Sequence, residues 1–330
     1  MKTFHLFAVL VTLPLLLSGC GKKDVVSEVE FIDNHQMGRS QILSPKNNVA
    51  IWYEITDDTV TITGCDENPS GQLIIPATIE DKPVTSIGAS AFFGSNLTSI
   101  TIPDRVTSIG KFGFHGCLNL TKINIPDGVT SIEDSSFTAC GLKSITIPDG
   151  VTSIEHAAFH LCPLTSITIP DSVTSIGESA FGVTSLTSIT FGKNSKLTSI
   201  GMNAFYSCES LKSIIIPDGV TSIEESAFDS CVNLTSITIP DGVNSIGKKT
   251  FNYCKSLEIL TIPDSVKIIG LGAFAKCLSL NNVTFLGDAP IVGEDIFEYS
   301  NPPTIFRKPD TKGWGDTWGG RPVKLITEKP

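Results

Sequence analysis

The sequence is poor in the residues from which most active sites and metal sites are built. It has 5 His, 3 Met, 3 Trp and 4 Tyr among 330 residues, and none of its nine cysteines forms a C-x-x-C pair. His156 and His160 are spaced i and i+4, but no third ligand lies nearby in the sequence, so no metal site is predicted. Phosphate-loop and dinucleotide-binding motifs are also missing. These absences argue against an enzyme and against a bound cofactor.

Positive charge and long hydrophobic runs are scarce as well. The 24 Lys and Arg are outnumbered by 34 Asp and Glu, which gives a net charge of −10. Nucleic acids and anionic lipid head groups are bound by basic patches, so no nucleic acid is predicted as a partner. The mostly apolar run at residues 4–17 has 14 residues, which is too short to cross a bilayer comfortably.

This short apolar run is typical of a signal peptide. It follows Lys2 and ends in L-S-G-C at residues 17–20, which resembles the lipobox of bacterial lipoproteins. The resemblance implies cleavage before Cys20 and acylation of that cysteine, which would anchor the protein to a membrane. It also implies location at the bacterial cell surface, in the outer membrane if the host has one, because Gly21 follows rather than Asp. The alternative is an ordinary secretory signal that happens to contain a cysteine.

What the sequence has in abundance is one repeated segment. The stretch L-T-S-I-T-I-P-D-R-V-T-S-I-G-K-F-G-F-H-G-C at residues 97–117 recurs along the chain, and its Pro or Gly position recurs every 22 to 25 residues. That period, together with an L-x-x-I-x-I core, is typical of a leucine-rich repeat solenoid. The recurring positions are Pro103, Pro126, Pro148, Pro170, Gly192, Pro217, Pro240 and Pro263.

Each copy is interpreted as one coil of that solenoid. The L-x-x-I-x-I stretch predicts a short strand parallel to its neighbours, and Pro ends the strand because it has no N–H for the ladder. The A-F-x-x-C stretch predicts a short helical turn whose Phe and Cys point inward. One coil buries too little to fold alone, so the coils are stable only as an array. The inward Phe column is Phe92, Phe114, Phe137, Phe159, Phe181, Phe205, Phe228, Phe251 and Phe274, with a degenerate last member at Phe297.

The chain is accordingly predicted to have five parts. Residues 1–19 are the lipoprotein signal peptide, and residues 20–48 are the lipidated cysteine with a flexible tether. Residues 49–75 form an N-terminal cap hairpin, residues 76–287 form the array of about ten coils, and residues 288–330 are a degenerate last repeat with a C-terminal cap. Caps are expected because a solenoid otherwise exposes the interior of its end coils.

Seven cysteines recur at equivalent places in successive coils. Their side chains are expected to point the same way about 4.8 Å apart, which is poor geometry for a disulfide. Buried, reduced thiols that act as small hydrophobic side chains are therefore predicted. Ser95, Thr184 and Ser300 stand at this position in other coils. The seven are Cys117, Cys140, Cys162, Cys208, Cys231, Cys254 and Cys277.

The copies I-P-D-G-V-T-S-I-x-x-x-A-F-x-x-C-x-x-L-T-S-I-T resemble the BspA-like leucine-rich repeat family of bacterial surface proteins. The resemblance covers residues 50–325. It implies a curved, right-handed solenoid that is displayed outside the cell and is often linked to adhesion or protein binding. It implies no catalytic residues, because the family motif consists of structural positions.

The outward side chains of the strands, mostly Ser and Thr, are expected to form a broad and shallow concave face. Such a face suits a macromolecule better than a small molecule. Residues that depart from Ser and Thr are candidates for partner contacts, and so are the lysines of residues 191–197 (F-G-K-N-S-K-L), a segment with two extra residues. The candidate partner-binding residues are Lys122, Asn124, Lys193, Lys196, Ile215 and Ile259.

Three functions stay open at this point. The leading one is a lipid-anchored, non-catalytic surface protein that binds a protein or glycan partner. The second is a structural coat component without a specific ligand, and the third is a hydrolase.

Overall fold

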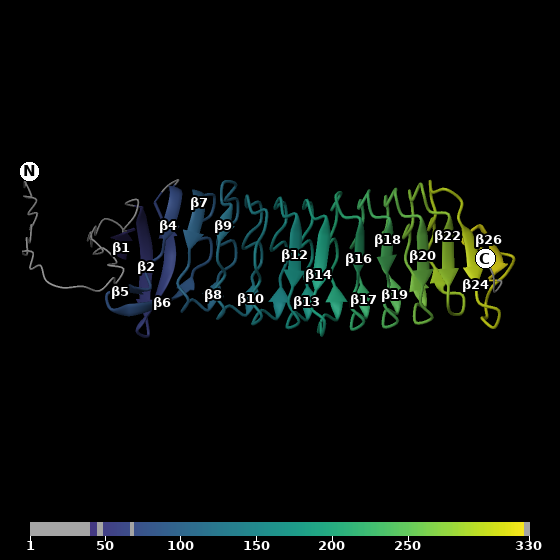
Figure 1. Ribbon diagram of the computed structural model, residues 1–330, viewed down its shortest axis with the longest axis horizontal. Coiled ribbons are helices and arrows are strands. Elements are labelled where there is room, and N and C mark those ends of the chain that lie inside the picture. Colours follow the sequence, from purple (N-terminus) through teal and green to yellow (C-terminus); the bar gives the residue numbers. More distant parts are fainter. Residues whose placement is uncertain (1–39, 45–48, 67–68, 327–330) are drawn as a thin grey trace, which may run out of the picture.

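The computed structural model describes residues 40–44, 49–66 and 69–326, and these form an elongated stack of coils (Figure 1). The predicted signal peptide and Cys20 lie outside the described residues. Within the described part of the chain the regular elements are all strands. Successive coils contribute strands to two ladders that run along the stack, and turns form the remaining side.

The first ladder, here called the Ser-Ile face, takes two residues from each V-T-S-I stretch. The strands are parallel and in register, so that Ile132 lies beside Ile154 and Ile154 beside Ile176. These isoleucines are buried and the residues before them face outward. The ladder contains β10 (Ser131–Ile132), β11 (Ser153–Ile154), β13 (Ser175–Ile176), β15 (Ser199–Ile200), β17 (Ser222–Ile223), β19 (Ser245–Ile246), β21 (Ile268–Ile269) and β23 (Ile291–Val292).

The second ladder, here called the Ile-x-Ile face, is built from the L-x-x-I-x-I stretches and is interrupted. Pairing joins β4 to β7 and β9, β12 to β14, β16 to β18, and β20 to β22, β24 and β26. In the described structure no ladder pairing joins β9 to β12, β14 to β16 or β18 to β20. The strands are β4 (Ser70–Ile74), β7 (Asn96–Thr101), β9 (Lys122–Ile123), β12 (Ser166–Ile169), β14 (Ser188–Phe191), β16 (Ser213–Ile215), β18 (Ser236–Thr238), β20 (Ile259–Ile262), β22 (Asn282–Phe285), β24 (Thr304–Arg307) and β26 (Arg321–Leu325).

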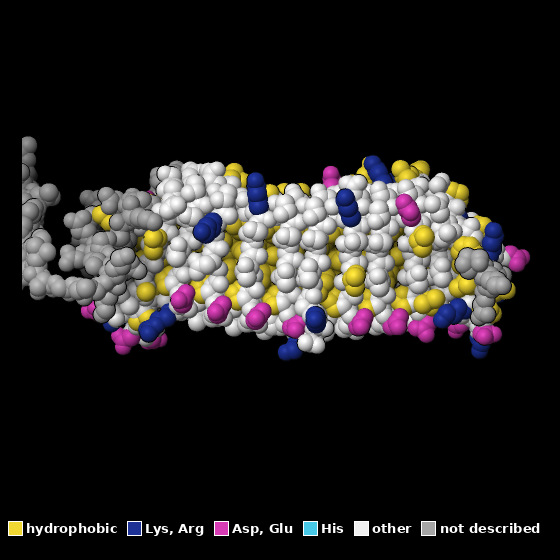
Figure 2. Space-filling model, in the orientation of Figure 1, with side chains coloured by type: hydrophobic (Ala, Val, Ile, Leu, Met, Phe, Trp, Pro, Cys, Tyr) yellow, Lys and Arg dark blue, Asp and Glu magenta, His cyan; other side chains and the backbone are white. Residues whose placement is uncertain are grey.

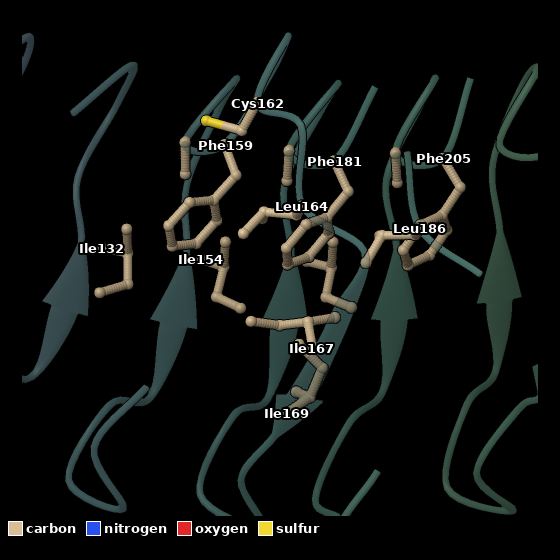
Figure 3. Packing of buried hydrophobic residues seen from close by; sticks show 14 of the residues in the cluster. Ile132, Ile154, Phe159, Cys162, Leu164, Ile167, Ile169, Phe181, Leu186 and Phe205 are labelled. Carbon is tan, nitrogen blue, oxygen red and sulfur yellow. The ribbon is translucent and has the colours of Figure 1, made fainter. Parts of the chain in front are cut away.

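The core is a set of columns that run through the coils (Figure 3). The Phe column predicted from the sequence is confirmed, because its rings stack from Phe92 through Phe297 with centroids 5.3–5.9 Å apart. Leu and Ile side chains from both ladders fill the space around them, as Leu164, Ile154 and Ile167 do beside Phe159. Burial of each large apolar side chain contributes roughly 1.5–3 kcal/mol.

The prediction of short helical turns is wrong. The N–H groups of Phe93 and Ser95 bond three residues back within their own coil, whereas those of Phe92 and Gly94 bond to carbonyls of the next coil. A helix directs all its amides along its own axis, whereas this segment sends every second amide to the neighbouring coil. The inward spacing of Phe and Cys is kept, but by consecutive turns.

The cysteine column is buried with free thiols, as predicted. The thiols do more than fill space, because each donates to the backbone carbonyl of the Phe in the preceding coil, for example Cys231 Sγ to Phe205 O at 3.2 Å. Ser300 makes the same bond to Phe274 O at 2.6 Å. The hydrogen bond explains why a hydroxyl replaces the thiol in this coil.

Strands that depart from the repeat lie at both ends of the described structure. Strands β1 (Ser40–Leu43), β2 (Ala50–Thr56) and β3 (Thr59–Cys65) are antiparallel, and β3 continues in parallel with β6 (Lys82–Ile87). Strand β6 also pairs with β5 (Thr78–Ile79) and β8 (Ser108–Ile109). At the other end β25 (Thr317–Trp318) pairs with β26. The capping role of both ends stays a prediction.

The boundary at the N-terminal end differs from the one predicted. Strand β1 lies in the segment assigned to the flexible tether, because Ile42 is buried opposite Ile51 and extends the sheet. At the C-terminal end, Phe297 stacks on Phe274, and Trp318 packs edge-on against Phe285 at 4.7 Å between centroids. The solenoid interior therefore extends into the degenerate last repeat predicted within residues 288–330.

One coil carries backbone strain that a substitution should relieve. Val183 adopts φ 56° at a position where another coil has Gly116, and a β-branched residue in the left-handed region is a strained outlier. Val183→Asn is expected to raise the free energy of unfolding by about 1 kcal/mol. The reverse change, Gly116→Val, should lower it by a similar amount. Urea denaturation of both variants tests the pair, and a stabilised Gly116→Val would contradict this explanation.

Candidate functional site

The structure places the six sequence-predicted candidates on or beside the Ile-x-Ile face. Ile215 and Ile259 are its most exposed apolar side chains, at 75% and 57% exposure. Lys122 is exposed on β9, and Lys193 and Lys196 are exposed in the loop between β14 and β15. None of these five side chains is needed to fill the core.

Asn124 has a structural role instead. Its side-chain Nδ2 donates to Ile102 O at 2.8 Å, and its Oδ1 accepts the Ile102 N–H at 2.8 Å. The amide therefore joins two neighbouring coils in the manner of a backbone pair. Because both polar ends are occupied by the backbone, Asn124 is a weaker candidate for partner contact than Lys122.

Two of the candidates meet in one groove. The space between β14 and β16, about 560 Å³ in volume, is lined by both strands, by the loop that follows β14 and by residues 216–219. It brings Lys193 next to the coil of Ile215, although the two were selected from separate features of the sequence. Lys122 and Ile259 do not line it, and Lys122 lines a smaller hollow of about 320 Å³ between β4, β7 and β9. The groove is the candidate functional site.

The groove lies at one of three interruptions of the Ile-x-Ile ladder. In the described structure pairing is absent between β14 and β16, as it is between β9 and β12 and between β18 and β20, and the coil between β14 and β16 also carries the two extra residues. Phe191 stands where β12 has Ile169, and the larger ring is only half-buried. The sequence reveals the insertion, but neither Phe191 nor Asp218 was predicted as a groove residue.

The loop after β14 is held in a defined position by the preceding coil. Asp171 Oδ1 accepts the Asn194 N–H at 3.0 Å, and Asp171 O accepts the Lys196 N–H at 3.0 Å. A Cβ at Gly192 would overlap the Asp171 carboxylate, so glycine is needed for this close approach. The two lysines are therefore carried on an anchored loop.

The electrostatic surroundings of the groove are unusual for this molecule. A row of acidic side chains follows one edge of the stack and is interrupted by basic side chains near its middle (Figure 2). In the coil of residues 191–197 the aspartate is missing, and Lys193 and Lys196 take its place. Neither lysine forms an ion pair with a described residue. The row consists of Asp104, Asp127, Asp149, Asp171, Asp218, Asp241 and Asp264.

No arrangement typical of catalysis or metal binding appears among the described residues. His156 Nδ1 lies 2.9 Å from Asp134 Oδ1 on the surface, and burial lowers the pKa of His160. No three His, Cys, Asp or Glu side chains of the described chain gather as metal ligands. Burial raises the pKa of Cys208 to about 11, so this thiol is a poor nucleophile at neutral pH. The described residues also include no helix of the length and apolar character that a bilayer requires.

Comparisons with known proteins agree with this architecture. The family described as BspA type leucine rich repeat region, in six copies, matches residues 85–196 and 184–303. No curated protein matches the chain.

Several solved structures are similar. A leucine-rich repeat protein from Bacteroides ovatus is 30% identical, with a TM-score of 0.72 over 84% of this chain and 75% of that one. A leucine rich cell surface protein from Faecalibacterium prausnitzii is 26% identical over 84% of this chain and 94% of that one, with a TM-score of 0.44. The leucine-rich repeat protein of T. pallidum is 26% identical over 63% and 87%, with a TM-score of 0.41.

Proposed function

Because the chain belongs to the BspA-type leucine-rich repeat family, we propose that it is a lipid-anchored bacterial surface protein that binds a protein partner. Binding would use the Ile-x-Ile face, and acylated Cys20 would hold the protein on the membrane. Catalysis has no part in this proposal. A glycan partner and a coat role without a ligand are the alternatives that the experiments below separate from it.

The observation that carries the binding proposal is the composition of the Ile-x-Ile face. Its outward positions are small hydroxyl side chains over most of the stack, and isolated apolar side chains such as Ile215 and Ile259 stand out from them. Exposed apolar side chains surrounded by polar ones are typical of the contact points of protein interfaces. The hollows on this face are open and shallow, which suits a macromolecule.

Support for the anchor comes from the sequence of the first 20 residues. The apolar run, the small residues and Cys20 occur in the order that lipoprotein processing requires. Two or three acyl chains, at about 0.8 kcal/mol per buried CH₂, would suffice for stable attachment. Cys20→Ser is expected to move the protein from the membrane fraction to the soluble fraction, as judged by immunoblotting. A variant that stays with the membrane would contradict lipid anchoring.

The binding proposal is tested by changing the Ile-x-Ile face without disturbing the fold. The triple variant is Lys122→Glu, Ile215→Thr and Ile259→Ser, in which each isoleucine is replaced by the residue that the preceding coil has at that position. We expect it to lose saturable binding of the protein partner that wild type captures from extracts of neighbouring or host cells, with affinity lowered at least about tenfold.

The matched control changes the opposite ladder in the same way. Ile268 and Ile291 are exposed isoleucines on the Ser-Ile face, at positions where most coils have serine, and Ile268→Ser with Ile291→Ser should leave binding unchanged. Equal binding by the triple variant would refute the role of the Ile-x-Ile face. Self-association alone, with no partner captured, would favour the coat role.

A further inference from the structure

The groove between β14 and β16 differs from the rest of the Ile-x-Ile face in its apolar content. Ile215 takes the outward position that Thr168 and Thr190 occupy in β12 and β14 and that Thr238 occupies in β18. It leaves three-quarters of its surface exposed. Phe191 and Ile189 are only partly buried on the other wall. An apolar side chain that entered this groove would therefore find apolar surface on both walls.

The charge of the groove differs as well. Lys193 lines it on the loop side, and Lys196 follows in the same loop. Asp218 lies on the opposite wall, and the Asp171 carboxylate is engaged by the Asn194 N–H. The two lysines, which form no ion pair with any residue that the structure describes, interrupt an acidic row on a molecule of net charge −10. Their positive charges attract a carboxylate to this place, whereas the aspartates of the flanking coils repel one.

The shape of the groove favours an extended chain. It runs beside β14, and a four-residue strand of this kind spans about 13 Å. The hydroxyls of Ser188, Thr190 and Ser213 line its walls and can donate to or accept from a peptide backbone. Sugar rings are typically bound by stacking on exposed aromatic faces, and the aromatic ring that lines this groove, Phe191, is half-buried.

We propose that this groove binds an extended peptide segment of a protein partner, in which a large apolar side chain sits beside an acidic one. The apolar side chain packs between Ile215 and Phe191, and the carboxylate pairs with Lys193, with Lys196 nearby. This inference rests on the proposed function and makes it specific, because it names one place on the Ile-x-Ile face and the chemistry of the segment bound there. Since Asp171 anchors the loop, little ordering of the loop is needed on binding.

The test uses randomised heptapeptides displayed on phage as the probe. They are selected on the wild-type protein and depleted on a Lys193→Glu, Ile215→Thr double variant, and the enriched sequences are made as fluorescein-labelled peptides. We expect Asp or Glu within two positions of Leu, Ile, Phe or Met in the enriched sequences. Fluorescence polarisation should show binding to wild type and about tenfold weaker binding to each single variant, Lys193→Glu and Ile215→Thr.

Two matched variants lie outside the Ile-x-Ile face. Lys111→Glu changes an exposed lysine of the turn side in the same way as Lys193→Glu, and Ile268→Ser removes an exposed isoleucine of the Ser-Ile face as Ile215→Thr does on the Ile-x-Ile face. Both should bind the peptides as wild type does. Circular dichroism spectra that match wild type exclude loss of fold as the cause of weaker binding.

Several outcomes would overturn the inference. These are no enrichment, enriched peptides without an acidic residue, and peptides that bind the groove variants as well as wild type. Polygalacturonate, an anionic polysaccharide, is tested in parallel, and binding of it alone with the same dependence on Lys193 and Ile215 would replace the peptide by a glycan.

The inference can also fail while the proposed function stands. In that case the triple variant of the Ile-x-Ile face loses the captured partner, but Lys193→Glu and Ile215→Thr, tested singly, keep it. If the triple variant keeps the partner as well, the proposed function itself is wrong.

Discussion

Replacement of Phe181 by alanine is expected to lower the free energy of unfolding by about 3–5 kcal/mol. The ring is fully buried and stacks on Phe159 at 5.5 Å and on Phe205 at 5.6 Å. Its loss leaves a cavity and removes two ring contacts in the middle of the column. Because each coil is stabilised mainly by its neighbours, the damage should weaken the coupling between the two halves of the array.

Urea denaturation followed by circular dichroism measures this effect. We expect a lower midpoint and a transition that broadens or divides into two steps, since the halves of an array separate when a central interface is weakened. Phe93→Ala is the matched control, because Phe93 is 59% exposed on the turn side of its coil. This substitution should lower the free energy of unfolding by less than about 1 kcal/mol. If Phe181→Ala lowered the free energy of unfolding by as little as this, the Phe column would contribute little to stability.

Alkaline pH is expected to unfold the protein under reducing conditions. Burial raises the pKa of Cys208 to about 11 and those of Cys65 and Cys277 to about 12, and it raises those of Cys140, Cys231 and Cys254 well above the ordinary value of 9.0. Below pH 9 these thiols are protonated in both states, so their contribution to stability is complete.

Above pH 9 the balance shifts toward the unfolded state. Thiols of the unfolded chain release their protons while the folded protein keeps them, so the free energy of unfolding falls as pH rises from 9 toward 11 and 12. The fall is about 1.4 kcal/mol per thiol per pH unit. Six buried thiols together should therefore produce a steep transition in the far-ultraviolet circular dichroism signal in this range.

A serine variant tests the origin of this transition. Cys208→Ser, Cys231→Ser and Cys254→Ser in one chain remove three titrating groups and keep a hydroxyl that can make the bond that Ser300 makes to Phe274 O. We expect the free energy of unfolding of this variant to depend less steeply on pH above 9, whatever its stability at neutral pH. An unchanged slope would assign the alkaline transition to other groups.

The two kinds of side-chain column illustrate how far sequence reasoning extends. The Phe column was predictable because a ring that recurs at a fixed period in stacked coils must meet its own copy. The cysteine column was predicted to be buried and unpaired, which is correct. Its hydrogen bonds to the Phe carbonyls were not predictable, because they join residues in different coils and depend on the approach of the two backbones.

The candidate site shows the same division. Lys193, Lys196 and Ile215 stand out in the sequence because they depart from the repeat, and the structure brings Lys193 and Ile215 to one groove. Asn124 departs from the repeat just as clearly, yet its amide serves the backbone of the neighbouring coil. A departure from the repeat therefore identifies a special position but does not say whether the solenoid or a partner uses it.

By itself, the sequence determined the coil length, the inward positions and the stacking of coils, because apolar side chains at a fixed period can be buried only against their own copies. Tertiary structure alone decided that the Phe-bearing segment is a series of turns, since every second amide there bonds to the next coil. It also decided that the ladder is interrupted between β14 and β16. Pairing of neighbouring strands depends on the fit between whole coils, and no single repeat contains that information.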